Sequence, residues 1–123
     1  MNVSRFLMGA ALVGASLAAC GEKLDPVPRA GVCAERANVS YRAEIAPLLL
    51  TYCQPCHSAS ALDRQGAPAA VNLDTYAEAA AKAAQANARI QAGSMPPADA
   101  QLPLSTDERC AFQAWVDHDT PEN

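Results

Sequence analysis

The chain has 123 residues, five cysteines and a formal net charge of −4 at pH 7. This length suits one domain behind a leader segment. No run of Lys and Arg is present, which argues against nucleic acid as a partner, and the acidic balance favours protein partners with a basic docking face. Aromatic residues make up only 5% of the chain. Because β-branched residues are also few, we expect an all-α fold.

The N-terminus has the pattern of an export signal. Arg5 supplies one positive charge, and an apolar run too short to span a membrane follows it. The run ends in Leu17-Ala18-Ala19-Cys20, which resembles a bacterial lipobox. We therefore predict that residues 1–19 are a lipoprotein signal peptide and that Cys20 is lipidated; ordinary signal cleavage, with Cys20 incidental, is the alternative. In the Gram-negative lipoproteins that this segment resembles, Gly21 in place of Asp points to the outer membrane, facing the periplasm.

The next segments are a tether and the start of the folded domain. Residues 20–32 contain two prolines, mixed charge and no periodic pattern, as a linker does. The domain is expected over residues 33–123. Its first helix is predicted from Glu44 to Tyr52, with Pro47 in the first turn, where a missing N–H costs nothing. Residues 58–72 are predicted to form a surface loop.

Between that helix and that loop lies the run Cys53-Gln54-Pro55-Cys56-His57. C-x-x-C-H is the spacing at which c-type haem is attached. Two thiols three residues apart can each form a thioether with one porphyrin vinyl group, and the following histidine is then placed to bind the iron. The sequence therefore predicts one covalent haem c held by Cys53, Cys56 and His57.

A second helix is predicted over residues 77–90. Thr75 and Glu78 have the spacing of a capping box, and the alanine-rich run behind them has high helix propensity. Its apolar stripe is weak, so we expect it to pack closely through small side chains. Gly93 is the expected end signal.

Met95 is predicted to be the second axial ligand of the iron. After Cys20 it is the only methionine, and His118 is the only histidine besides His57. Met95 precedes two prolines and is therefore held extended, and a thioether is a soft ligand that favours ferrous iron. Core packing is the usual role of a lone methionine. His118, in the last turn of the final helix, is better explained by the helix dipole.

The final helix is predicted from Ser105, which forms a second capping box with Glu108, to about His118. Phe112 and Trp115 fall on one face of it and are expected in the core or against the haem. No convincing strand is present. We expect three or four helices in all.

The five cysteines can be assigned without remainder. With Cys20 given to lipid and two cysteines given to haem, Cys33 and Cys110 are left to pair in the oxidising compartment that an export signal implies. Two free buried thiols are the alternative.

Two other uses of Cys53 and Cys56 are less favoured. A zinc site needs four ligands, and no second Cys/His pair stands at metal-binding spacing. A thiol–disulfide oxidoreductase carries its cysteine pair at the end of a strand in a βαβ frame, and no such strand is predicted here.

The C-x-x-C-H motif, the segment Ile90-x-x-Gly93-x-Met95-Pro96-Pro97 and a C-terminal helix with Trp115 together resemble a mono-haem cytochrome c domain of the class I type, in its lipoprotein-anchored bacterial form. The resemblance covers roughly residues 33–120. It implies a small cytochrome c fold around one covalent haem, with His57 and Met95 as axial ligands.

The resemblance also implies a function: a single-electron carrier rather than an enzyme, working with donor and acceptor proteins of the periplasm. A haem enzyme or sensor with a labile sixth ligand, peroxidase-like or gas-binding, is the alternative. One departure stands out. The first helix lacks the Gly/aromatic pattern by which many such cytochromes cross their first and last helices, and a Cys33–Cys110 link could take its place.

Overall fold

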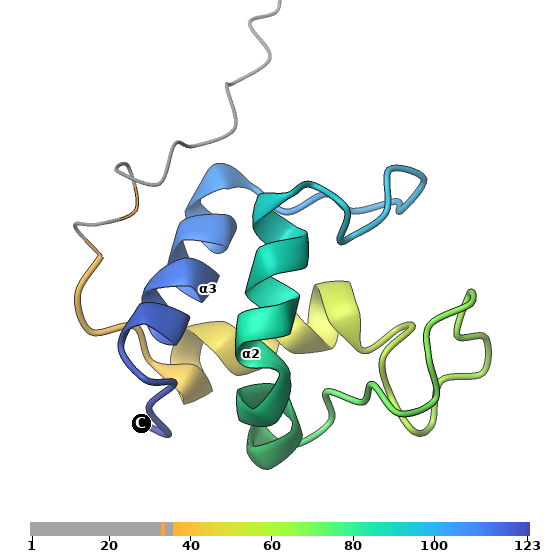
Figure 1. The fold of residues 1–123 in the computed structure, drawn as a ribbon, viewed down its shortest axis with the longest axis horizontal. Helices are drawn as coiled ribbons and strands as arrows, with labels where there is room; N and C mark the ends of the chain where they lie inside the picture. Colours follow the sequence, from red (N-terminus) through yellow and green to blue (C-terminus); the bar gives the residue numbers. More distant parts are fainter. Residues whose placement is uncertain (1–32, 34–35) are drawn as a thin grey trace, which may run out of the picture.

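The computed structural model describes Cys33 and residues 36–123. The predicted signal peptide, the lipidation site Cys20 and the tether lie outside the described residues. Within the described part the fold is helical and has no strand (Figure 1), so the predicted all-α class is confirmed. None of the helices in this part is both long enough and apolar enough to cross a membrane.

Three helical regions follow one another along the chain. The first is continuous and consists of η1 (Tyr41–Ile45), α1 (Ala46–Leu48) and η2 (Leu49–Cys53). The second is α2 (Tyr76–Gln91) and the third is α3 (Thr106–Asp117). α2 and α3 pack against each other, and the first region packs against α3. Two long connections extend on one side of α2, one from the first helix to α2 and one from α2 to α3 (Figure 1).

The first helix begins earlier than predicted. The hydroxyl of Ser40 accepts a hydrogen bond from the backbone of Ala43 at 3.2 Å, and the carboxylate of Glu44 accepts one from the backbone of Ser40 at 3.1 Å. This is a reciprocal cap, but its two residues stand four apart rather than three. The reason is the wide π-type first turn, in which the Ile45 N–H donates to the carbonyl of Ser40, five residues back.

Pro47 consequently lies inside a continuous helix, so the prediction that it stands in the first turn is wrong. A proline has no N–H for the helical ladder, and its ring collides with the carbonyl four residues back in a regular α-helix. Here it enters at the start of α1, directly after the wide π turn. The change of helix type at this point accommodates the ring.

α2 and α3 begin where the sequence predicts. Both capping boxes, Thr75 with Glu78 and Ser105 with Glu108, are formed in both directions. Gly93 follows the last residues of α2 with φ of +69°, the left-handed conformation in which glycine ends a helix without strain. These predictions are confirmed.

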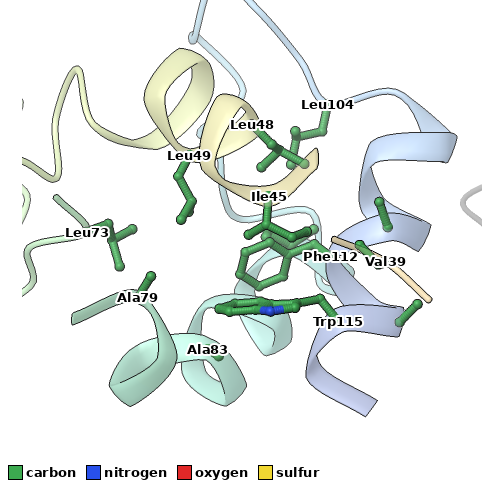
Figure 2. Packing of buried hydrophobic residues seen from close by; sticks show 13 residues of the cluster. Val39, Ile45, Leu48, Leu49, Leu73, Ala79, Ala83, Leu104, Phe112 and Trp115 are labelled. Atoms are coloured by element: carbon green, nitrogen blue, oxygen red, sulfur yellow. The ribbon is translucent and has the colours of Figure 1, made fainter. Parts of the chain in front are cut away.

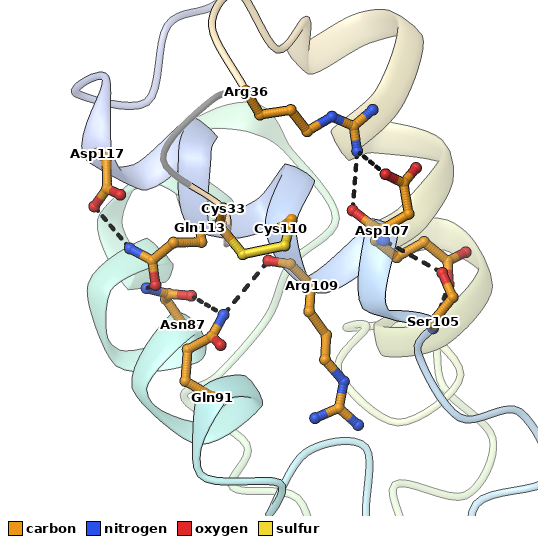
Figure 3. The surroundings of a disulfide bond; sticks show 11 residues. Cys33, Arg36, Asn87, Gln91, Ser105, Asp107, Arg109, Cys110, Gln113 and Asp117 are labelled. Atoms are coloured by element: carbon orange, nitrogen blue, oxygen red, sulfur yellow. Dashed lines mark hydrogen bonds and ion pairs between the residues drawn. A yellow bond between two sulfur atoms is a disulfide. The ribbon is translucent and has the colours of Figure 1, made fainter. Parts of the chain in front are cut away.

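α2 packs through small side chains, as expected. Its buried positions are Ala79, Ala83, Asn87 and Ile90, which share one face of the helix. Asn87 is the polar member of this face, and its amide nitrogen donates to Gln113 Oε1 on α3 at 2.7 Å (Figure 3). A buried amide next to alanines is satisfied in this way without a cavity.

The core is centred on three side chains from two helices. Ile45 and Trp115 are fully buried and Phe112 is 1% exposed, and Figure 2 shows the three packed against one another. The Trp115 indole N–H donates to the Pro121 carbonyl at 3.1 Å, which satisfies the only polar atom of the ring. The prediction that Phe112 and Trp115 are core residues is confirmed.

An aromatic contact joins the first helix to the last. The ring of Tyr41 lies 5.6 Å from that of Trp115 and 5.0 Å from that of Tyr76, between centroids. The Gly/aromatic pattern is absent from the first helix as predicted from the sequence, and Tyr41 supplies an aromatic contact with Trp115 that was not predicted. Tyr41 lies in the part of the helix that the sequence prediction left out, which is why the contact was missed.

Cys33 and Cys110 also join the start of the domain to α3. Their sulfur atoms lie 2.09 Å apart, the length of a disulfide bond (Figure 3). The structure thus brings the predicted pair together in addition to the aromatic contact, not in place of it.

Candidate functional site

The C-x-x-C-H motif occupies the C-terminal end of the first helix. η2 ends at Cys53, and the chain then turns so that both the Cys56 and the His57 N–H groups donate to the Cys53 carbonyl, at 3.1 and 2.8 Å. All three side chains are partly buried. The two cysteines and the histidine are therefore held within a single turn.

The imidazole of His57 is oriented by the loop that follows it. Nδ1 lies 3.3 Å from the carbonyl oxygen of Val71. Because a carbonyl can only accept, a hydrogen bond here puts a proton on Nδ1; in the neutral ring the lone pair is then on Nε2, the nitrogen that could bind a metal. A hydrogen bond from the second ring nitrogen to a backbone carbonyl is the usual arrangement for a histidine that binds a metal.

Two further hydrogen bonds fasten the motif to the same loop. The backbone N–H of Leu73 donates to the His57 carbonyl at 2.8 Å, and the Gln54 side chain donates to the Leu73 carbonyl at 2.8 Å. Leu73 itself is buried in the core. The position of the histidine is thus tied to the hydrophobic core through one residue.

Cys53 and Cys56 form no disulfide with each other or with Cys33 and Cys110. Burial, with a smaller effect of the neighbouring Cys56, raises the pKa of the Cys53 thiol to about 12. This thiol is neutral at physiological pH and is a poor nucleophile.

Met95 lies on a separate segment. Its backbone N–H and that of Ser94 both donate to the Arg89 carbonyl, at 3.2 and 3.0 Å, so the end of α2 fixes the start of this segment. The Met95 side chain is 38% exposed. The connection that carries it and the loop after His57 extend on the same side of α2 (Figure 1).

The large exposed apolar side chains of the described residues lie close to the predicted haem residues along the chain. Besides Met95 they are Leu50 just before the motif, Leu62 in the loop after it, and Leu102 beyond Met95, with exposed fractions of 64%, 106% and 56%. Isolated exposed leucines are ordinary, but these flank the predicted haem residues on both sides.

A hollow of about 300 Å³ lies elsewhere, between the first helix and the start of α3. Its lining includes Glu44, Tyr52, Asp107 and Glu108, and a hydrogen bond to the Glu108 carboxylate raises the pKa of the Tyr52 hydroxyl. This hollow could not be predicted from the sequence, because its residues come from helices far apart in the chain. It contains none of the predicted haem residues.

His118 is exposed and forms the C-cap of α3, the position at which the helix dipole was expected to account for it. Across Cys33 and residues 36–123, no three His, Cys, Asp or Glu side chains converge as metal ligands would.

The residues at the motif fit a c-type haem. They offer two free thiols at one turn and an imidazole with Nδ1 engaged by a carbonyl, and the thioether of Met95 is the soft donor that suits haem iron. Comparison of the chain with family models, curated proteins and solved structures finds no match.

Proposed function

We propose that the protein is a single-electron carrier with a small cytochrome c fold and one covalent haem c, and that it is not an enzyme. The observation that carries the proposal is the contact of His57 Nδ1 with the Val71 carbonyl, directly after two unpaired thiols. When bound, the haem would supply reversible one-electron chemistry at its iron.

Each residue of the site would have a separate task. Cys53 and Cys56 would hold the group through thioethers. His57 would bind the iron through Nε2, and the hydrogen bond at Nδ1 would hold the ring plane and raise its basicity. Met95 would supply a second ligand from a segment whose start is fixed by the Arg89 carbonyl.

The proposal includes the location of the protein. A lipid on Cys20 would anchor the protein to a membrane, facing the periplasm. The N-terminal pattern predicts that this membrane is the outer membrane. The Cys33–Cys110 contact at disulfide distance fits that oxidising compartment. The acidic net charge favours donors and acceptors with a basic docking face.

The raised pKa of Cys53 argues against a thiol–disulfide oxidoreductase. In such enzymes the attacking cysteine has a lowered pKa, commonly at the N-terminal end of a helix. Here the motif follows the C-terminal end of a helix, and burial shifts the pKa of Cys53 in the opposite direction.

The test is the visible spectrum of the protein expressed with a c-type maturation system, oxidised and reduced, in native and denaturing buffer. We expect haem absorption that stays with the denatured chain, and in the ferric protein a weak red band from methionine sulfur to iron. Cys53→Ala with Cys56→Ala should abolish covalent attachment. Met95→Ala should retain the covalent haem and lose the red band.

Histidine variants supply a matched control. His57→Ala should lose the axial ligand, whereas His118→Ala should leave the spectrum unchanged. Rapid, tight binding of carbon monoxide or cyanide to the wild-type protein would favour the haem enzyme or sensor instead. Absence of any haem would contradict both.

A further inference from the structure

We infer that Arg64 is a positioning residue for His57: it fixes the Val71 carbonyl that orients the imidazole, and so sets how strongly that ring donates to a bound iron. This inference rests on the proposed function. Arg64 lies in the loop after the motif, seven residues beyond His57.

The Arg64 guanidinium forms hydrogen bonds with several parts of the loop after the motif. It donates to four backbone carbonyls and to one amide oxygen. The carbonyl acceptors are those of Ser58, Ala67, Pro68 and Val71, and the amide oxygen is Asn72 Oδ1. The group is partly buried, so a single side chain supplies hydrogen bonds that the loop lacks from regular structure.

Two of these acceptors flank His57. One is the carbonyl of Ser58, the residue directly after it. The other is the carbonyl of Val71, which Arg64 Nη2 reaches at 2.9 Å and His57 Nδ1 at 3.3 Å. A carbonyl oxygen has two lone pairs and can accept both donors.

The two bonds to the shared oxygen differ in strength. The bond from the guanidinium is charge-assisted and shorter, and it is the stronger of the two. Arg64 therefore determines where this oxygen lies, and the imidazole follows it. The backbone bond between Leu73 and His57 would still hold the end of the loop. Without Arg64, however, the Val71 carbonyl would be less firmly placed, and the ring would lose part of its orientation and of the added basicity that this acceptor provides.

The test compares two Arg→Lys variants of the haem-loaded protein. Arg64→Lys keeps the charge but loses the planar fork that reaches several carbonyls at once. Arg42→Lys, at an exposed position of η1, makes the same replacement away from the loop. The readouts are the solvent exchange rate of the His57 Nδ1 proton, by NMR of the reduced protein, and the midpoint potential.

For Arg64→Lys we expect exchange of the Nδ1 proton about tenfold faster, the factor that loss of one hydrogen bond gives. We also expect a higher midpoint potential, since a less basic imidazole stabilises ferric iron less. For Arg42→Lys both readouts should match the wild type. A change in unfolding stability alone would be the mark of a merely structural role and would overturn the inference.

If the Arg64→Lys protein does not fold, Asn72→Ala can be used instead. It removes the amide oxygen that accepts a hydrogen bond from the Arg64 guanidinium at 3.0 Å and leaves Arg64 unchanged. The same direction of change, smaller in size, is expected. A protein that carries haem bound by His57 but responds to neither variant would overturn the role of Arg64 and leave the proposed function intact. A wild-type protein without haem would overturn both.

Discussion

Cys33 and Cys110 are 77 residues apart in the chain, yet their Cα atoms lie 4.8 Å apart. Cys110 belongs to α3, two residues before the buried Phe112. The pair therefore attaches the beginning of the domain to the helix that contains the fully buried Trp115. Closing so long a loop restricts the unfolded chain strongly, and on the chain-entropy account the bond contributes about 4–5 kcal/mol.

Replacing both cysteines, Cys33→Ala with Cys110→Ala, should lower the free energy of unfolding by about 4 kcal/mol, measured by denaturant titration without reductant. The double variant is preferred because a single variant leaves an unpaired thiol. Wild-type protein in reductant should approach the same stability. Complete alkylation of both thiols in the native oxidised protein would show that the bond does not form.

The alanine face of α2 gives a second prediction. Ala83 is 3% exposed within the core cluster, whereas the next residue, Ala84, is exposed. Ala83→Leu should destabilise the protein by about 1–3 kcal/mol, because a packed interface cannot take three more carbons without displacement. Ala84→Leu makes the same change on the solvent side and should alter the unfolding midpoint little. Equal effects would mean that α2 does not pack through this face.

Asp74 gives a prediction about pH. The Ala59 N–H donates to its carboxylate at 2.8 Å, and this bond, helped by the Ser58 hydroxyl and the charge of Arg64, lowers the pKa of Asp74. A carboxyl whose pKa is lower in the folded state stabilises the protein above its unfolded pKa, and that stability is lost as the pH falls through the folded pKa.

The wild-type protein should therefore lose stability as the pH falls below about 4, the ordinary pKa of aspartate. Asp74→Asn should flatten this part of the profile of urea midpoint against pH. Asp99→Asn, an exposed position in the connection before α3, removes the same charge without removing the bond to Ala59 and should retain the wild-type slope. Parallel profiles for Asp74→Asn and the wild type would contradict the assignment.

How much of the fold could be predicted depends on whether the signal is local. The caps of α2 and α3 are local, since Thr75 with Glu78 and Ser105 with Glu108 lie within one turn, and both helices begin where these pairs predict. The start of the first helix was missed because its cap, Ser40 with Glu44, spans a π turn and has an unusual spacing. A search for Ser followed four residues later by Glu would have found it.

The candidate site likewise has a part that could be predicted from the sequence and a part that could not. The relation of Cys53, Cys56 and His57 is encoded in five consecutive residues and could be predicted. The partner of His57 could not, because Val71 contributes only its backbone carbonyl, and a backbone acceptor 14 residues away leaves no mark on side-chain identity. Arg64 was a visible charge in a polar loop, but its role depends on carbonyl groups that converge only in the folded chain.

The reactivity of the Cys53 thiol can distinguish a haem attachment site from the active site of a thiol–disulfide oxidoreductase. In the haem-free chain, its pKa of about 12 leaves about a thousandfold less thiolate at pH 8 than an ordinary cysteine has. In haem-free Cys56→Ser protein, Cys53 should therefore react with iodoacetamide far more slowly in the native state than in denaturant. The reaction can be measured by mass spectrometry of the peptide that contains Cys53.

Because restricted access alone would also slow the reaction, the rate should be measured against pH; a thiol with this pKa reacts faster up to at least pH 11. Native and denatured rates that agree would contradict the raised pKa and return the oxidoreductase to consideration. In the wild-type protein matured with haem, neither Cys53 nor Cys56 should react even after denaturation, because a thioether has no thiol to alkylate.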